Sequence, residues 1–311
     1  MKTAYRELCE HTSNIPLFSQ DWWLDAVAGE DWDVALVEKG GQVVASLPYV
    51  YRKKRGFRTI SMPPLTQSLG PWLRPSDAKI DRQLGQQKEL MNALIDQLPQ
   101  YDYFLQNWHH TIQNWLPFHW RGYSQTSRVT YQLPDLNDVD ALWSGLSDNT
   151  RKQIRKARNK FGLTLEESEN PEQFFELNEM VFARQGRRTP YSRELVKRID
   201  DAASQRNSRR ILIARDKSQR PHAGVYLVWD KNSAYYLMGG GDPALRNSGA
   251  SSLCMWEAIQ FSSGVSQRFD FEGSMIEPIE RFVRSFGAQQ VQYHQISRTP
   301  SRLLRLRAAL R

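Results

Sequence analysis

One stretch, residues 234–273, constrains the fold of this chain more than any other. It begins with a short aromatic and apolar run, residues 234–238, and ends with another, residues 268–273, and each has the composition of a strand. Between them, apolar residues recur at helical intervals over residues 251–261, after a glycine-rich segment. The stretch therefore predicts the order strand, loop, helix, strand.

The loop over residues 239–251 has the composition of an anion-binding loop. Its glycines, Gly239 to Gly241 and Gly249, predict positive φ angles that let backbone N–H groups converge on one point. The start of the next helix adds unpaired N–H groups and the positive end of the helix dipole, and Arg246 adds a full charge. The loop suits a phosphate, although a turn without a ligand explains such a loop equally well.

The residues at the end of this loop resemble a known motif. Residues 246–251 read Arg-Asn-Ser-Gly-Ala-Ser, similar to the pyrophosphate loop of GCN5-related N-acetyltransferases (GNAT), Arg/Gln-x-x-Gly-x-Gly/Ala, except that serine stands last. The order around it, with Phe-Asp-Phe-Glu-Gly at 269–273 after the helix, resembles the branch that contains the Fem peptidyltransferases and related acyltransferases. A valine at Gly249 is expected to block the phosphate without unfolding the protein. The resemblance assigns eight residues to the donor: Met238, Gly239, Arg246, Asn247, Ser248, Gly249, Ala250 and Ser251.

The element order predicts an α/β (α+β) fold with two tandem GNAT-like domains, each a mixed, mostly antiparallel sheet flanked by helices. The second half reads as strand, two helices, three antiparallel strands, helix, strand, helix and strand, and the first third repeats this more loosely. No sequence repeat is visible, so the duplication rests on this order and on the resemblance. Loop-forming residues at 134–138 place the boundary between domains 1–134 and 135–311, the second carrying the donor loop.

The charge of the chain favours anionic partners. With 42 Lys and Arg against 34 Asp and Glu, the net charge of +8 suits phosphate-bearing cofactors, nucleic acid or other polyanions. A basic run at residues 151–160 lies on a predicted helix, where either a solvated face or a phosphate site explains it, and the resemblance raises Arg151 and Arg155 for the second role. Residues 302–311 predict a short amphipathic helix, for which docking on the domain is favoured over contact with an anionic surface.

The compartment is predicted from two absences in the sequence. Cys9 and Cys254 are too few for a disulfide scaffold, and no signal core or run of about twenty apolar residues is present. We expect a cytoplasmic protein, with a peripheral position at the inner face of the membrane left open. The six histidines show no metal-ligand spacing, so no metal site is predicted.

Two acids and a tyrosine are the candidate catalytic residues. Asp270 and Glu272 alternate with two phenylalanines, which predicts that both acids lie on one face of a strand. A carboxylate at a strand end beside the acyl group is a candidate general base for amine acylation, and Tyr236 is a candidate donor of a proton to a leaving thiolate. Asp270 matches the motif of the branch and Glu272 falls on its variable position. The alternatives are a loop-fixing carboxylate and a core tyrosine.

The resemblance also implies an acceptor site. The loop at 186–192 overhangs the acceptor in this branch, which adds Arg187 and Tyr191 to the substrate-binding candidates Arg151 and Arg155. Arg281, on the closing helix after Gly273, is a further candidate and stands where relatives often carry Lys. The predicted reaction moves an acyl group from acetyl-CoA or another acyl-CoA to a small-molecule, glycan or peptide amine held between the two domains, in cell-envelope or polysaccharide metabolism. Transfer from aminoacyl-tRNA to a peptidoglycan precursor is the first alternative, with tRNA the less favoured partner. A non-catalytic polyanion-binding protein is the second.

Overall fold

The computed structural model describes residues 1–273 and 275–310, and the chain divides into two compact units. Unit 1 comprises Met1–Arg128 with Gln292–Arg311, and unit 2 comprises Val129–Val291. The sequence predicts a single boundary after residue 134. The structure instead divides the chain within two strands, β6 (Ser124–Leu133) and β12 (Gln289–Arg298), and groups the C-terminal segment with unit 1.

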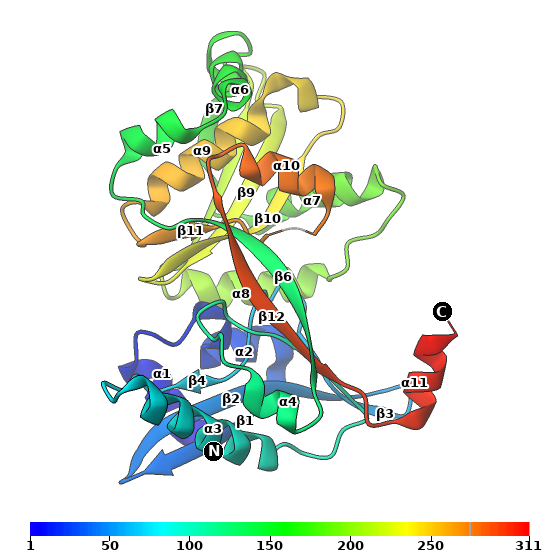
Figure 1. The fold of residues 1–311 in the computed structure, drawn as a ribbon. Coiled ribbons are helices and arrows are strands. Elements are labelled where there is room, and N and C mark those ends of the chain that lie inside the picture. Colours follow the sequence, from blue (N-terminus) through cyan, green and yellow to red (C-terminus); the bar gives the residue numbers. More distant parts are fainter. Residues whose placement is uncertain (274, 311) are drawn as a thin grey trace. The chain divides into compact units, whose positions relative to one another are not determined.

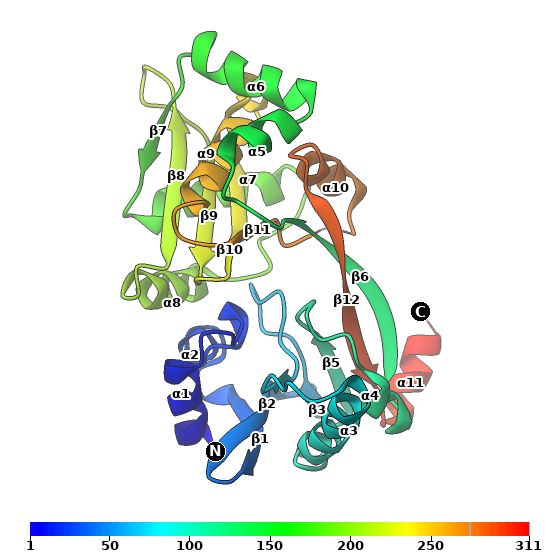
Figure 2. The same cartoon turned by 60° about the vertical axis from the view of Figure 1, so that its left-hand side comes forward.

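Unit 1 is a mostly antiparallel sheet with helices on both faces (Figures 1 and 2). Its strands follow the order β1-β2-β3-β5-β12, with β3 and β5 parallel. Alternate residues of the first strand face opposite ways: Trp32 meets Tyr5 of the first helix, whereas Ala35 packs in a core with Met91 and Leu94 of α3. The elements are α1 (Lys2–His11), α2 (Asp21–Ala28), β1 (Trp32–Lys39), β2 (Gln42–Lys54), β3 (Phe57–Ile60), β4 (Trp72–Leu73), α3 (Ile80–Asp96), β5 (Tyr103–Asn107), α4 (Leu116–Trp120) and α11 (Arg302–Ala309).

Unit 2 has the sheet order β6-β11-β10-β9-β8-β7, with α9 on one face and α7 on the other (Figure 2). Neighbouring residues of β9 show the two faces: the Cys254 thiol of α9 donates to the carbonyl of Ala223, while Gly224 lies against Phe174 of α7. The elements are α5 (Val139–Gly145), α6 (Asp148–Asn159), β7 (Thr164–Glu167), α7 (Pro171–Ala183), α8 (Arg193–Ser204), β8 (Arg209–Arg215), β9 (Pro221–Trp229), β10 (Ser233–Gly241), α9 (Ala250–Ser262), β11 (Arg268–Asp270) and α10 (Glu277–Arg284).

The two units share one topology, and the predicted fold class is confirmed. In unit 2 the antiparallel strands β8-β9-β10 lead through α9 to β11, which is parallel to β10. In unit 1 the antiparallel strands β1-β2-β3 lead through α3 to β5, which is parallel to β3. The next sheet position is filled by β6 beside β11 and by β12 beside β5. Each unit is thus completed by a strand from a distant part of the chain.

Local capping residues start the helices of unit 2 where the sequence predicts. The hydroxyl of Ser147 accepts the N–H of Thr150 at the start of α6, and that of Ser192 accepts the N–H of Leu195 at the start of α8. Two helices of unit 1, α1 and α4, have no clear signal in the sequence. Neither α1 nor α4 has a side-chain cap, and α4 is only five residues long, too short for helical periodicity to register.

Candidate active site

The parallel strands β10 and β11 separate after three residue pairs. The paired residues are 233–235 of β10 and 268–270 of β11. The second strand ends at Asp270, whereas β10 continues to Gly241. Over residues 236–241, β10 therefore has β9 on one side and, among the described strands, no partner on the other. Such an open edge presents backbone N–H and C=O groups to a ligand.

A β-bulge marks the place where the two strands part. Tyr236 lies opposite Leu227 and Met238 lies opposite Tyr226, so Leu237 is an extra residue on β10. A bulge interrupts the ladder and redirects the neighbouring backbone groups, and bulges are frequent beside active sites. Met238 and Gly239, both predicted donor residues, follow directly after it.

The corresponding place in unit 1 is closed. The N–H of Leu69 donates to the carbonyl of Asn107 at 2.7 Å, and the N–H of His109 donates to the carbonyl of Leu69 at 3.0 Å. These bonds extend the parallel ladder past β3, and the Trp108 ring fills the space beside Gly70. The opening between parallel strands is thus a feature of unit 2, where the sequence places the donor loop.

Gly249 joins the donor loop to α9. Its φ angle is +82°, and a Cβ at this position would collide with the carbonyl oxygen of Gln153 on α6. Glycine is therefore required for both the left-handed backbone and the close approach of α6. The next N–H groups, those of Ser251 and Ser252, have no carbonyl of their own helix to bind, because they belong to its first turn.

The other predicted donor residues divide into exposed and buried ones. Arg246, Asn247 and Ser251 are exposed, whereas Ser248 and Ala250 are buried. The hydroxyl of Ser248 accepts the N–H of Ala250 at 3.4 Å. Within the described residues no acidic side chain pairs with Arg246, so no carboxylate there competes with a ligand for its guanidinium.

The glycines at 239–241 have a different role from the predicted one. They belong to β10, and none of them has a positive φ angle, so the prediction of a left-handed loop at these residues is wrong. A Cβ at Gly240 would lie 2.8 Å from the backbone nitrogen of Asn178, and one at Gly239 would collide with the Tyr236 hydroxyl. These glycines let α7 and a tyrosine lie directly against the strand.

Glu272 lies past the end of β11 with a φ angle of +57°, so the predicted strand alternation through Asp270 and Glu272 is wrong. Both flanking phenylalanines, Phe269 and Phe271, are buried. The Oε1 atom of Glu272 is buried and has no hydrogen-bond partner in the described part of the chain. Burial raises the pKa of Glu272 well above its usual 4.5, and the Asp270 carboxylate adds to the rise. A strained backbone and an unpaired buried carboxyl are together typical of a catalytic base.

Asp270 has the contacts of a structural carboxylate. It is 3% exposed and accepts three hydrogen bonds: from the Thr130 hydroxyl at 2.5 Å, the Gln132 amide at 2.7 Å and the backbone N–H of Glu272 at 2.8 Å. Gly273, with a φ angle of +49°, lies so close to β6 that a Cβ would collide with the Thr130 backbone. These contacts hold the turn that carries Glu272.

Asn178 was not predicted and connects three elements around this turn. Its side chain is almost fully buried, donates to the carbonyl of Gly239 at 2.7 Å and accepts from the Tyr191 hydroxyl at 2.9 Å. Burial raises the pKa of Tyr191 to about 12, and the Glu272 carboxylate adds to the rise. An amide on the apolar face of α7, beside Leu177, is the sequence signal that identifies such a residue.

The hydroxyl of Tyr236 lies against Gly239. Burial raises its pKa well above the ordinary value, and the groups of Cys254, Tyr191 and Glu272 add to the rise. The phenol therefore stays protonated at neutral pH and can donate a proton. Tyr191, through Asn178, and Tyr236 thus both lie at Gly239 on the open edge of β10, and the charge of Glu272 acts on both phenols.

The predicted phosphate-binding arginines of α6 contact other parts of unit 2. Arg151 donates to the carbonyl of Ser144 at 2.8 Å and to Asp148 at 2.5 Å, so it closes the C-terminal end of α5. Arg155 lies over the ring of Trp143, 5.8 Å from its centroid. The contact of α6 with Gly249 places this helix beside the donor loop.

The remaining acceptor candidates are exposed. Arg187 lies in the connection between α7 and α8, and Arg281 lies on α10. Their roles toward an acceptor stay predictions.

Residues 1–273 and 275–310 contain no group of three His, Cys, Asp or Glu side chains that could hold a metal. None of the helices they form has the length and apolar character to cross a bilayer.

The substitution Gly249→Ala is expected to lower the free energy of unfolding by about 1–3 kcal/mol, because the added methyl meets Gln153 and forces a left-handed alanine. Urea unfolding measures this, and Gly145→Ala, where a Cβ meets open space, is the control. Equal stability of the two variants would contradict the described packing of α6. A valine at Gly249 should destabilise the protein for the same reason, so this variant does not separate donor binding from stability.

Comparisons with known proteins agree with this geometry. Residues 146–274 match the family model of the acetyltransferase (GNAT) domain, and this range contains the donor loop, the parted strands and Glu272. No curated protein matches in sequence. The crystal structure of FemX is similar, with a TM-score of 0.71 and 13% identity over 94% of this chain and 95% of that one.

Two further solved structures share the fold. One is the C-terminal domain of a putative lysylphosphatidylglycerol synthetase from Agrobacterium fabrum, with a TM-score of 0.58 and 12% identity over 96% of this chain and 92% of that one. The other is a tandem GNAT protein from the clavulanic acid biosynthesis pathway, with a TM-score of 0.51 and 11% identity over 89% and 93%. Residues 146–274, within unit 2, are therefore a GNAT-type domain, and the fold of the chain is similar to that of FemX and of a tandem GNAT protein.

Proposed function

We propose that this protein is an N-acyltransferase that moves an acyl group from a CoA thioester to an amine. The observation that carries the proposal is the separation of β10 from β11, with Glu272, whose Oε1 atom is buried and unpaired, just past the end of β11. An open strand edge, a helix N-terminus and an unpaired base at one place are what acyl transfer from a phosphate-bearing thioester needs.

The donor fits unit 2 in an extended form. Its diphosphate would lie against the first-turn N–H groups of α9, with Arg246 supplying a charge-assisted bond and Asn247 and Ser251 supplying polar side chains. The thioester arm would run along the open edge of β10 past Gly239 and Met238. This path ends at the bulge.

The transfer itself needs one base, one acid and a stabilised oxyanion. Glu272 takes a proton from the amine, whose nitrogen then bonds to the thioester carbonyl carbon. Backbone N–H groups at the bulge stabilise the negative oxygen of the tetrahedral intermediate. Its collapse breaks the carbon–sulfur bond, and Tyr236 gives its proton to the thiolate. Acid–base catalysis of this kind contributes about 10²–10⁴-fold.

The acceptor belongs on the side of the connection between α7 and α8. Tyr191, held by Asn178, would contact the amine-bearing group, and the exposed Arg187 and Arg281 favour an acceptor with acidic groups. A small-molecule, glycan or peptide amine of cell-envelope or polysaccharide metabolism meets this description.

Aminoacyl-tRNA is a second candidate donor. The exposed basic residues Lys152 and Arg155 lie on α6, which contacts the donor loop at Gly249, and this arrangement favours a polyanion larger than CoA. RNA that co-purifies at low salt would favour this donor over a free CoA thioester.

The proposed reaction predicts release of free CoA thiol from an acyl-CoA only when a suitable amine is present. The measurement follows thiol release with a chromogenic reagent across acetyl-CoA and longer acyl-CoAs, each tested with amino sugars, amino acids and peptides. The acylated amine is then identified by mass. Binding of acyl-CoA without release for any amine in the panel would favour the alternative, a non-catalytic polyanion-binding protein.

A further inference from the structure

The last helix of the described chain presents an apolar stripe that the described residues of unit 1 leave exposed. Leu303, Leu306 and Leu310 are 69%, 63% and 88% exposed. Leu303 and Leu306, three residues apart, lie on one face of α11, and Leu310 is its C-cap, whose N–H donates to the carbonyl of Leu306 and continues the same face. Leu304, on another face, is half-buried. Docking of the whole helix, as favoured from the sequence, is therefore wrong for these three leucines.

Arginines flank this stripe. At 100° per residue, Arg302 and Arg307 fall on either side of the three leucines, and both are exposed. Residues 292–311, the C-terminal segment of unit 1, contain five arginines and no aspartate or glutamate, so no acidic residue of this segment offsets their charge. An apolar stripe with cationic flanks is typical of a helix that lies in the interface of an anionic membrane.

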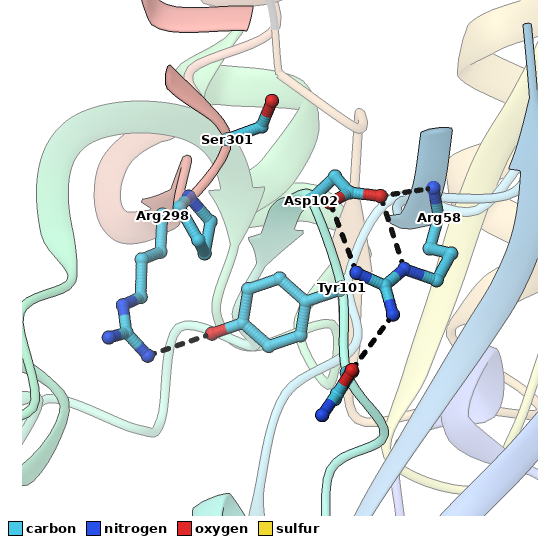
Figure 3. Close-up of a pocket in the computed structure, with 7 residues that line it drawn as sticks. Arg58, Tyr101, Asp102, Arg298 and Ser301 are labelled. Carbon is cyan, nitrogen blue, oxygen red and sulfur yellow. Dashed lines mark hydrogen bonds and ion pairs between the residues drawn. The ribbon is translucent and has the colours of Figure 1, made fainter. Parts of the chain in front are cut away.

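A basic turn lies near the start of the helix. Lys53, Lys54 and Arg55 are exposed at the turn between β2 and β3. Lys53 pairs across the hairpin with Arg58, and Arg58 lines a pocket together with Ser301, the N-cap of α11 (Figure 3). The turn and the helix therefore present their charges within the same part of unit 1.

Contacts in this pocket fix the start of the helix. The guanidinium of Arg58 donates to both oxygens of Asp102, each at 3.2 Å, and the backbone N–H of Ser301 donates to the carbonyl of Asp102 at 3.4 Å. Arg298 donates to the Tyr101 hydroxyl at 3.3 Å (Figure 3). The helix is thus held at its N-terminal end by Asp102, and Asp102 is bound in turn by Arg58 of β3, a strand that flanks the basic turn.

We propose that this basic-apolar surface, formed by Leu303, Leu306 and Leu310, their flanking arginines and the turn at 53–55, binds the surface of an anionic phospholipid membrane. The leucines enter the boundary between headgroups and hydrocarbon, and the cations meet the lipid phosphates. Three exposed leucines would not contribute to RNA binding, because proteins contact RNA through its phosphates, bases and sugars. The surface would bring the acyltransferase unit to a membrane without a spanning helix.

Vesicle flotation of the full chain tests this. We expect binding to vesicles that contain phosphatidylglycerol, and little binding to phosphatidylcholine alone. The triple variant Leu303→Ser, Leu306→Ser, Leu310→Ser should lower the partition coefficient at least about tenfold. The variant Lys53→Gln, Lys54→Gln, Arg55→Asn should lower it by a similar factor, since each cation near the surface contributes. Asparagine is chosen because Arg55 has a φ angle of 52°.

The matched control is Ile80→Ser with Leu84→Ser on α3, which are 69% and 46% exposed in the same unit. This variant should bind vesicles as the unaltered protein does, and circular dichroism should show all variants folded. Vesicle binding that is unaffected by the leucine variant would overturn the proposal. The proposal would also be overturned if the protein bound tRNA but not vesicles, and if that binding depended on the cations and not on the leucines.

Discussion

Replacing Glu272 with Gln is expected to lower kcat for acyl transfer by about 10²–10⁴-fold and, at the same time, to stabilise the protein at neutral pH. The loss follows because the amide accepts no proton from the amine. The gain follows because the neutral amide removes a buried carboxylate whose Oε1 has no partner in the described structure. Opposite effects on activity and stability are typical of a catalytic residue and not of a structural one.

The pH dependence of stability follows from the raised pKa of Glu272. Because burial lifts this pKa well above 4.5, the folded state holds the proton more tightly than the unfolded chain does. The stability that this provides is complete below about pH 4.5 and is lost as the pH rises through the folded pKa. Urea unfolding of Glu272→Gln should therefore show a gain over the unaltered protein at about pH 8 that vanishes at about pH 4. In the kinetics, kcat/KM should rise with pH through the raised pKa, and this limb should be absent in the variant.

Asp270→Asn is the matched control for this experiment. Asp270 accepts three hydrogen bonds, and an amide NH₂ in its place would face donors. We expect a loss of about 1–3 kcal/mol in the free energy of unfolding, in contrast to the gain at Glu272. If Glu272→Gln keeps full activity, or destabilises as Asp270→Asn does, Glu272 is not the base.

Arg246→Ala is expected to raise the dissociation constant for an acyl-CoA by roughly ten- to a hundredfold, because a charge-assisted bond to a diphosphate contributes about 1.5–3 kcal/mol. The difference from the unaltered protein should shrink as salt is added, since Arg246 is exposed. Isothermal titration at two ionic strengths measures both effects.

Lys231→Ala supplies the control for Arg246. Lys231 is also an exposed cation and lies just before the opposite end of β10. Its loss should leave the affinity for acyl-CoA unchanged. Equal losses at Arg246 and Lys231 would mean that the net charge of the protein, and not the loop, attracts the donor.

Element order and helix starts could be predicted from the sequence because they depend on local chemistry. Ser147 and Ser192 start helices through their own hydroxyls, and the periodicity of α9 is set within thirteen residues. The fold class follows from this order. The unit boundary does not, because the division within β6 and β12 depends on pairing between distant segments.

The site was harder to predict, because its key features come from contacts between elements. The sequence does not show which role a glycine has. Gly249 has a left-handed backbone, whereas Gly240 allows the close approach of a helix. The strand ends at Asp270, three residues before the end of the predicted run, and the left-handed conformation of Glu272 moves its carboxyl away from the predicted face. Asn178 joins the site only through the packing of α7 on β10.

The most direct test of the account is isothermal titration of acetyl-CoA and longer acyl-CoAs into the unaltered protein. A saturable signal for at least one of them, weakened by Arg246→Ala and retained by Lys231→Ala, is the result that the open edge of β10 and the start of α9 predict. The absence of heat for every donor, from a folded protein at low salt, would contradict a thioester site between the parted strands.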